Sequence, residues 1–191
     1  QAAYEAKVAQ RDAKAKETGK KPGGKPPKPP APGVQATEQI NLTDEESRIM
    51  PVSGGGFEQA YNAQAAVDTG SLLVVTAAVT QSTNDKEQVV PMLGHLAALP
   101  ESLGKVGQLL ADTGFCSGKN VEACEAAAIE PLIAVGRDEH HVGWRERFTE
   151  PDPLPAGATP MARMTHRLKT KAGRAAYALR KQTVEPVFGI I

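Results

Sequence analysis

The chain lacks most features that would place a protein outside the cytoplasm or in a membrane. Among its 191 residues are only two cysteines, Cys116 and Cys124, too few for a disulfide framework and not spaced as zinc ligands. No run of about 18 apolar residues occurs, so no segment is long enough to span a bilayer. The N-terminus has no signal-peptide core. These absences predict a cytoplasmic protein with ordinary thiols.

A formal net charge of zero conceals a separation of charge along the chain. Residues 1–36 carry a net charge of +5, residues 37–160 carry −11, and residues 161–191 carry +6. Clustered lysine and arginine suggest a polyanionic partner, because phosphate binding needs such clusters. The alternative is solvated charge on a tail and on a helix.

Composition divides the chain near residue 37. Residues 2–17 are rich in helix-forming residues, and residues 20–33 contain six prolines and read as a basic flexible linker. We therefore expect a helical and Pro/Lys-rich linker over 1–37 and a folded domain over 38–191. Because the chain starts with Gln1 and stops in an apolar run at Ile191, we also expect it to be cut at both ends.

Within the domain, apolar patterning predicts alternating strands and helices. A turn at Asp68-Thr69-Gly70-Ser71 separates two apolar segments and predicts a hairpin. The predicted order is strands within 57–68 and 72–79, a helix from a cap at 82–85 to 99, a strand over 105–111, a helix over 118–128, a strand over 130–135, an irregular stretch over 137–160 and a helix over 161–182. This order predicts a mixed α/β fold with a sheet covered by helices.

Three acids have positions that suit metal-dependent phosphodiester chemistry, in which carboxylates grip divalent cations. Asp112 follows a predicted buried strand, and its alternative role is that of a turn residue. Asp68 has similar surroundings, which the hairpin turn explains. Glu185 is the only acid among seven bases near the C-terminus, where a salt bridge is the alternative; Thr183 there is a candidate cap of a helix with Pro186 in its first turn.

An ordered set of motifs resembles the DDE transposases of bacterial insertion sequences. The resemblance runs from about residue 38 to the end, and no single motif carries it. The motifs are Asn41-Leu42-Thr43-Asp44 to Met50, Gly56-Phe57 with Gln59-Ala60-Tyr61-Asn62-Ala63-Gln64, Val79-Thr80-Gln81 with Asn84-Asp85-Lys86, Leu110-Ala111-Asp112-Thr113-Gly114-Phe115, and Arg180-Lys181-Gln182-Thr183-Val184-Glu185-Pro186-Val187-Phe188-Gly189.

The resemblance implies a ribonuclease H-like domain whose Asp, Asp and Glu bind two Mg²⁺ (or Mn²⁺) ions. Asp112 matches the second Asp and Glu185 the final Glu. The first Asp normally lies upstream on the first strand in an Asp-Gly-Thr context, which this chain lacks. We therefore expect the first strand to be absent, Asp68 to be a hairpin residue, and the chain alone to be inactive.

The resemblance also implies that the partner is DNA. The implied reaction is cleavage of a DNA strand, followed by attack of the freed 3′-hydroxyl on target DNA. The full-length protein is expected to be a homo-oligomer on DNA. A related signature places Tyr and Arg before the final acid; here Lys181 holds the arginine position, with Arg180 beside it, and Tyr177 lies one residue too early. Phosphate contacts are expected from seven bases: Arg163, Arg167, Lys169, Lys171, Arg174, Arg180 and Lys181.

Two other functions remain open at this point. A non-catalytic DNA-binding remnant would use the basic ends for salt-sensitive binding that is indifferent to Mg²⁺. An aspartic-protease-like hydrolase is suggested by Asp-Thr-Gly at Asp68 and at Asp112. Too few residues separate these two aspartates to build a protease lobe, and the predicted helices do not suit an all-β one.

Overall fold

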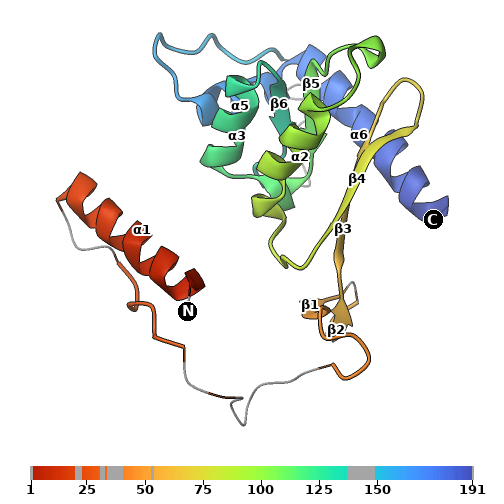
Figure 1. The fold of residues 1–191 in the computed structure, drawn as a ribbon. Helices are drawn as coiled ribbons and strands as arrows, with labels where there is room; N and C mark the ends of the chain where they lie inside the picture. The colour runs from red at the N-terminus through yellow and green to blue at the C-terminus, as the bar shows by residue number, and fades with distance from the viewer. Residues whose placement is uncertain are drawn as a thin grey trace. The chain divides into compact units, whose positions relative to one another are not determined.

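A computed structural model describes residues 2–19, 23–30, 33, 41–52, 54–136 and 149–190. The chain divides into two compact units, Gln1–Glu45 and Glu46–Ile191. The first contains helix α1 (Ala2–Thr18), which confirms the helix expected there (Figure 1). Residues 20–22, 31 and 32 of the predicted linker and residues 137–148 of the predicted irregular stretch lie outside the described residues. No helix in the described ranges is long and apolar enough to cross a membrane.

The second unit begins with two antiparallel hairpins. Strand β1 (Arg48–Pro51) pairs with β2 (Phe57–Ala60), and β3 (Asn62–Val67) pairs with β4 (Val74–Thr80). The prediction of one strand within 57–68 was wrong, because that segment divides at Tyr61 into β2 and β3. Strand β2 pairs with β1, which precedes it in the chain, and only β3 pairs with β4. Three consecutive glycines, 54–56, make this possible, since all three adopt positive φ in the β1–β2 turn.

The helix expected before Pro100 is present but begins late. Asn84 caps a single 3₁₀ turn, η1 (Asp85–Glu87), and α2 (Val89–Ala97) follows it. A second 3₁₀ turn, η2 (Glu101–Leu103), leads toward the next strand. The capping cluster therefore acts as predicted, but on a short turn that precedes the helix.

A parallel pair of strands forms the centre of the unit. Strand β5 (Gln108–Ala111) pairs with β6 (Glu130–Ile133). The connection runs through a 3₁₀ turn, η3 (Thr113–Phe115), and helix α3 (Gly118–Ala126). Ser117 caps α3 as predicted, because its hydroxyl accepts a hydrogen bond of 3.2 Å from the Asn120 N–H.

The apolar core lies around these two strands. One buried cluster joins α2 to α3 through Val89, Leu93 and Cys124, with Leu109 packed against it. The other joins α3, β6 and α5 through Val121, Ile133 and Met164, again with Leu109 against it. Figure 1 shows α2, α3 and α5 gathered around β5 and β6. A mixed α/β fold with helix-covered strands is therefore confirmed, although its pairs of strands form three separate two-stranded sheets among the described residues.

The single helix predicted over 161–182 is instead two helices. They are α5 (Pro160–Lys169) and α6 (Lys171–Ile190), divided at Thr170, which has an extended backbone. The Thr170 hydroxyl accepts a hydrogen bond of 3.0 Å from the Gly173 N–H, so it caps the start of α6. The helix start considered at Thr183 was wrong: Thr183 lies inside α6, where its hydroxyl donates to the Leu179 carbonyl at 2.7 Å. Pro186 also lies inside α6.

Candidate functional site

Asp112 stands where strand β5 ends and η3 begins. The strand pairs with β6 up to Ala111, which lies opposite Ile133, so the backbone before Asp112 is held by the sheet. Asp112 caps η3: its Oδ1 accepts a hydrogen bond of 2.8 Å from the Gly114 N–H. The side chain remains exposed. A carboxylate fixed at one oxygen and open to solvent at the other suits a cation ligand or a hydrogen-bond acceptor.

A second carboxylate, Asp85, lies close to Asp112; the sequence indicated it as part of a helix cap and of one family motif, but not as a candidate acid. The Asp85 Oδ1 accepts hydrogen bonds from the side-chain amides of Asn62 (2.7 Å) and Gln64 (3.1 Å) on β3. A Cβ placed on Gly114 would lie 3.0 Å from Asp112 Oδ1 and 3.4 Å from Asp85 Oδ2. The two carboxylate oxygens are therefore no farther apart than the sum of these two distances.

Glu185 lies on α6 and is well exposed. Its Oε1 is 3.9 Å from Arg180 Nη2, with 62% of the Glu185 side chain and 19% of the Arg180 side chain accessible. The Arg180 guanidinium also lies over the Tyr177 ring, 5.9 Å from its centroid, in a cation–π contact. The structure thus brings together Tyr177, Arg180 and Glu185, whose spacing departs from the family signature.

The acids do not form a complete metal centre within the described residues. There, no group of three or more His, Cys, Asp or Glu side chains is placed to hold one ion. Asp112 has the oxygen chemistry that Mg²⁺ prefers, and Asp85 supplies a second carboxylate close to it. A site for two ions needs carboxylates beyond this pair.

Asp68 is occupied by its turn. Its Oδ2 accepts hydrogen bonds of 2.7 Å from both the backbone N–H and the hydroxyl of Ser71. These two bonds, the hydroxyl first, hold the pKa of Asp68 below its usual value. Helix α2 lies between Asp68 and Asp112 in the chain, which does not match the all-β lobe that an aspartic protease would need.

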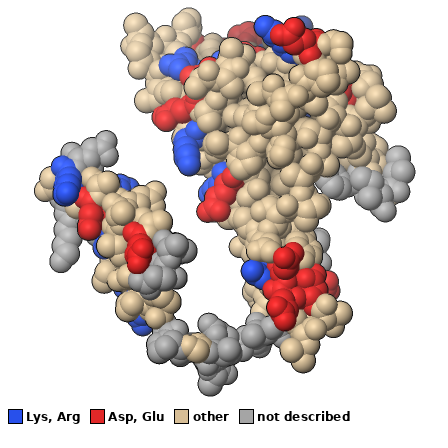
Figure 2. All heavy atoms as spheres, in the orientation of Figure 1, with Lys and Arg blue, Asp and Glu red and all other residues tan. Residues whose placement is uncertain are grey.

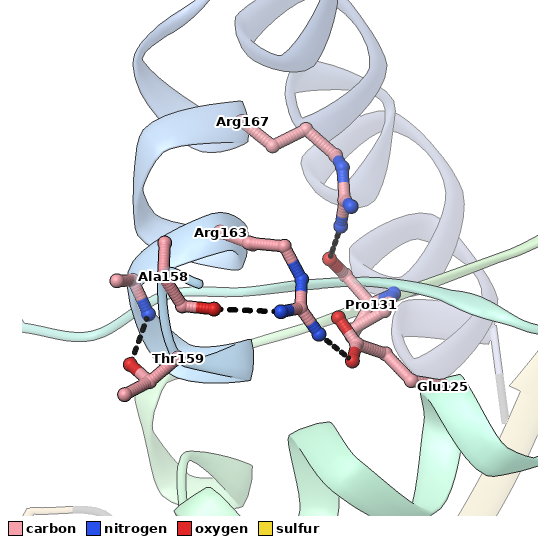
Figure 3. A network of polar contacts seen from close by, with 7 residues as sticks. Glu125, Pro131, Ala158, Thr159, Arg163 and Arg167 are labelled. Atoms are coloured by element: carbon pink, nitrogen blue, oxygen red, sulfur yellow. Dashed lines mark hydrogen bonds and ion pairs between the residues drawn. The ribbon is translucent and has the colours of Figure 1, made fainter. Parts of the chain in front are cut away.

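Three of the seven bases expected to contact DNA make ion pairs inside the unit: Arg180 with Glu185, and Arg163 and Arg167 of α5 with acids of α3 and β6. Figure 3 shows the surroundings of Arg163 and Arg167. Arg163 on α5 contacts Glu125 of α3 at 2.5 Å and donates to the Ala158 carbonyl at 2.7 Å. Arg167 contacts Glu130 of β6 at 2.7 Å. It also donates to the Pro131 carbonyl at 3.2 Å, the contact drawn in Figure 3. These contacts attach α5 to α3 and β6, so both guanidinium groups have a structural role apart from any phosphate.

The other bases differ in their surroundings. The Arg174 guanidinium donates to the Lys169 carbonyl. Among the described residues, no ion pair involves the ammonium groups of Lys169, Lys171 or Lys181. Figure 2 shows basic side chains on this face of residues 46–191 in small groups beside acidic ones, over a largely uncharged surface. Lys169, Lys171 and Lys181 are thus exposed, whereas Arg163 and Arg167 are held in contacts within the unit.

The two cysteines are free, and Cys124 is fully buried. Burial, with a smaller contribution from the neighbouring Glu125 charge, raises the pKa of the Cys124 thiol from 9.0 to about 11. The interpretation of these residues as ordinary thiols fits this environment.

Comparison with known proteins identifies the family. No curated protein and no solved structure matches the chain. A family model described as a transposase DDE domain matches residues 31–191, which include both hairpins, the parallel strands and helices α5 and α6. The chain therefore belongs to the family of transposase DDE domains.

Proposed function

We propose that Asp112 and Glu185 are two of the carboxylates of a Mg²⁺-dependent site that cleaves DNA and transfers the freed strand during transposition. Membership of the transposase family implies a role in DNA transposition. The observation that carries the finer proposal is the placement of Asp112 directly after β5, exposed and anchored by Gly114. Bound Mg²⁺ would supply positive charge that activates the nucleophile and stabilises the leaving oxygen.

The same observations suggest where a third carboxylate belongs. Among the described residues, β3 pairs only with β4, and β5 pairs only with β6. A further strand added to β5 in parallel would end beside Asp112. We propose that the first strand of a ribonuclease H-like sheet, carrying the first Asp, fills this place. We therefore expect the 191 residues alone to be inactive, because they supply only two of the three carboxylates. We propose that residues 38–191 form the part of the catalytic domain that carries these two.

DNA is the proposed partner, bound by a cytoplasmic homo-oligomer. We propose that Lys169, Lys171 and Lys181 carry more of the phosphate binding than Arg163 and Arg167, because no ion pair among the described residues occupies these lysines. Arg174 and Arg180 complete the basic set on α6. The alternative, a DNA-binding remnant without catalysis, uses the same bases and predicts binding that Mg²⁺ does not alter.

The test compares aspartate and glutamate variants in the complete transposase with DNA that carries the element's ends. We expect Asp112→Asn and Glu185→Gln each to reduce Mg²⁺-dependent strand cleavage by at least about 100-fold, because each removes a charged ligand. Asp68→Asn is the matched control and should retain cleavage, since its carboxylate serves the hairpin turn. Full activity of Asp112→Asn would refute the proposal, and DNA binding unaffected by Mg²⁺ without cleavage would support the remnant.

A further inference from the structure

One buried amide joins two turns that are far apart in the sequence. Asn120 on α3 is only 1% exposed. Its Nδ2 donates to the Lys86 carbonyl and to the Phe115 carbonyl, both at 2.8 Å. Lys86 lies in η1, the Asp85 turn, and Phe115 is the last residue of η3, the Asp112 turn. A single side chain therefore holds these two turns against the start of α3.

The turns that Asn120 joins are those that carry the neighbouring carboxylates. Asp85 is itself oriented by the amides of Asn62 and Gln64, which bind its Oδ1. Its Oδ2 is left on the side of Gly114, the residue whose N–H anchors Asp112. The position of Asp112 relative to Asp85 therefore depends on how closely the two turns approach.

We propose that Asn120 is a positioning residue for Asp112, acting by holding the Asp85 turn against the Asp112 turn. Loss of the Asn120 amide would leave the Lys86 and Phe115 carbonyls without their donor in a water-poor place, and the turns would separate to regain water. Groups that orient a metal ligand alter metal affinity by about 10- to 100-fold when removed. The inference rests on the proposed role of Asp112 in metal binding.

The packing of α3 alone does not require an asparagine at this position. Val121 and Cys124, its buried neighbours on the helix, are apolar and fully enclosed. A leucine at position 120 would keep the branched arrangement of four side-chain heavy atoms, although its methyl groups take more room than the amide. It would remove both hydrogen bonds to the two turns.

The experiment compares Asn120→Leu with Val121→Ala, a control that weakens α3 packing without touching either carbonyl. In metal-free protein, hydrogen exchange measured by mass spectrometry should become at least about 10-fold faster for backbone amides within 85–90 and 112–117 in Asn120→Leu, more than elsewhere in the chain. Val121→Ala should show no such selectivity. In Mn²⁺ titrations followed by electron paramagnetic resonance, half-saturation should rise about 10- to 100-fold in Asn120→Leu and stay near the wild-type value in Val121→Ala.

Asn120→Asp, which keeps the shape but lacks the amide donors, serves as a second variant if leucine prevents folding. The positioning role alone is overturned if hydrogen exchange in both turns is unchanged, or if Asn120→Leu leaves the Mn²⁺ half-saturation unchanged while Asp112→Asn raises it. If Asp112→Asn binds Mn²⁺ as well as the wild type does, the proposed function itself is overturned, and with it any role of Asn120 in metal binding. The two failures are therefore distinguishable.

Discussion

The junction between α5 and α6 predicts that Gly173→Ala destabilises the protein, although alanine is the better helix former. Gly173 lies in the first turn of α6 and is buried. A Cβ at this position would lie 1.9 Å from the Arg167 carbonyl oxygen and 2.7 Å from its carbon. To reach an ordinary contact of 3.4 Å, the carbonyl would have to recede by about 1.5 Å, which would open the bend at Thr170.

Two effects of opposite sign decide the result. Replacing glycine by alanine inside a helix stabilises it by up to about 1 kcal/mol. Forcing an extra carbon into a closely packed place costs about 1–3 kcal/mol. Because the obstacle at Gly173 is backbone and not the end of a flexible side chain, we expect the larger cost and a net loss of about 1–2 kcal/mol.

Urea unfolding followed by far-ultraviolet circular dichroism measures this difference. The matched control is Gly189→Ala in the same helix, where nothing lies within 4 Å of the added carbon. Gly189→Ala should be neutral or stabilising by up to about 1 kcal/mol. If Gly173→Ala raises the unfolding midpoint as much as Gly189→Ala does, the bend does not depend on the close approach of Gly173 to Arg167, and the reasoning fails.

Three further predictions concern the core, the thiols and the candidate site. Met164→Ala should cost about 2–5 kcal/mol in urea unfolding, because Met164 is fully buried between α3 and β6, whereas the half-buried Met161→Ala should cost clearly less. In folded protein near pH 8, iodoacetamide should modify Cys116 before Cys124, since burial raises the pKa of Cys124 to about 11 and so keeps it a thiol; equal labelling in a mass spectrum would contradict this. Gly114→Ala should impair Mg²⁺-dependent cleavage but leave the free energy of unfolding nearly unchanged, because its Cβ would lie 3.0 Å from the Asp112 carboxylate in an exposed place. Unaltered cleavage would argue against a role of Asp112.

Local signals predicted much of the second unit. The Asp68 turn, the Ser117 cap and the apolar runs at β5 and β6 depend on neighbours in sequence, and the structure contains all of these features. The helix break at Thr170 was missed because threonine is common inside helices. Its signal was the glycine three residues later, which frees the space that the bend needs. The β1–β2 hairpin was missed because its strands are short and largely exposed, so no apolar pattern marks them.

The candidate site was predictable only in part, for a related reason. Asp112 follows an apolar strand, a signal within one short segment. Asp85 looked like a helix cap, and its position near Asp112 depends on amides in β3 and on Asn120 in α3. These contacts join residues 21 to 34 positions apart in the sequence. Such an arrangement is set by how the elements pack, which no local pattern reports.

Charge gives the opposite lesson, because a strong sequence signal overstated what individual residues are free to do. A net charge of +6 over 161–191 made every base there a candidate for phosphate. Yet Arg163 and Arg167 hold α5 to Glu125 and Glu130, acids of the oppositely charged middle segment. Part of the charge separation along the chain is therefore complementarity within the fold. Arg167→Ala should therefore disturb the docking of α5 on β6. Lys169→Ala should instead reduce the salt dependence of DNA binding. The slope of log affinity against log salt should become shallower by about 0.9 for each phosphate that the variant no longer neutralises.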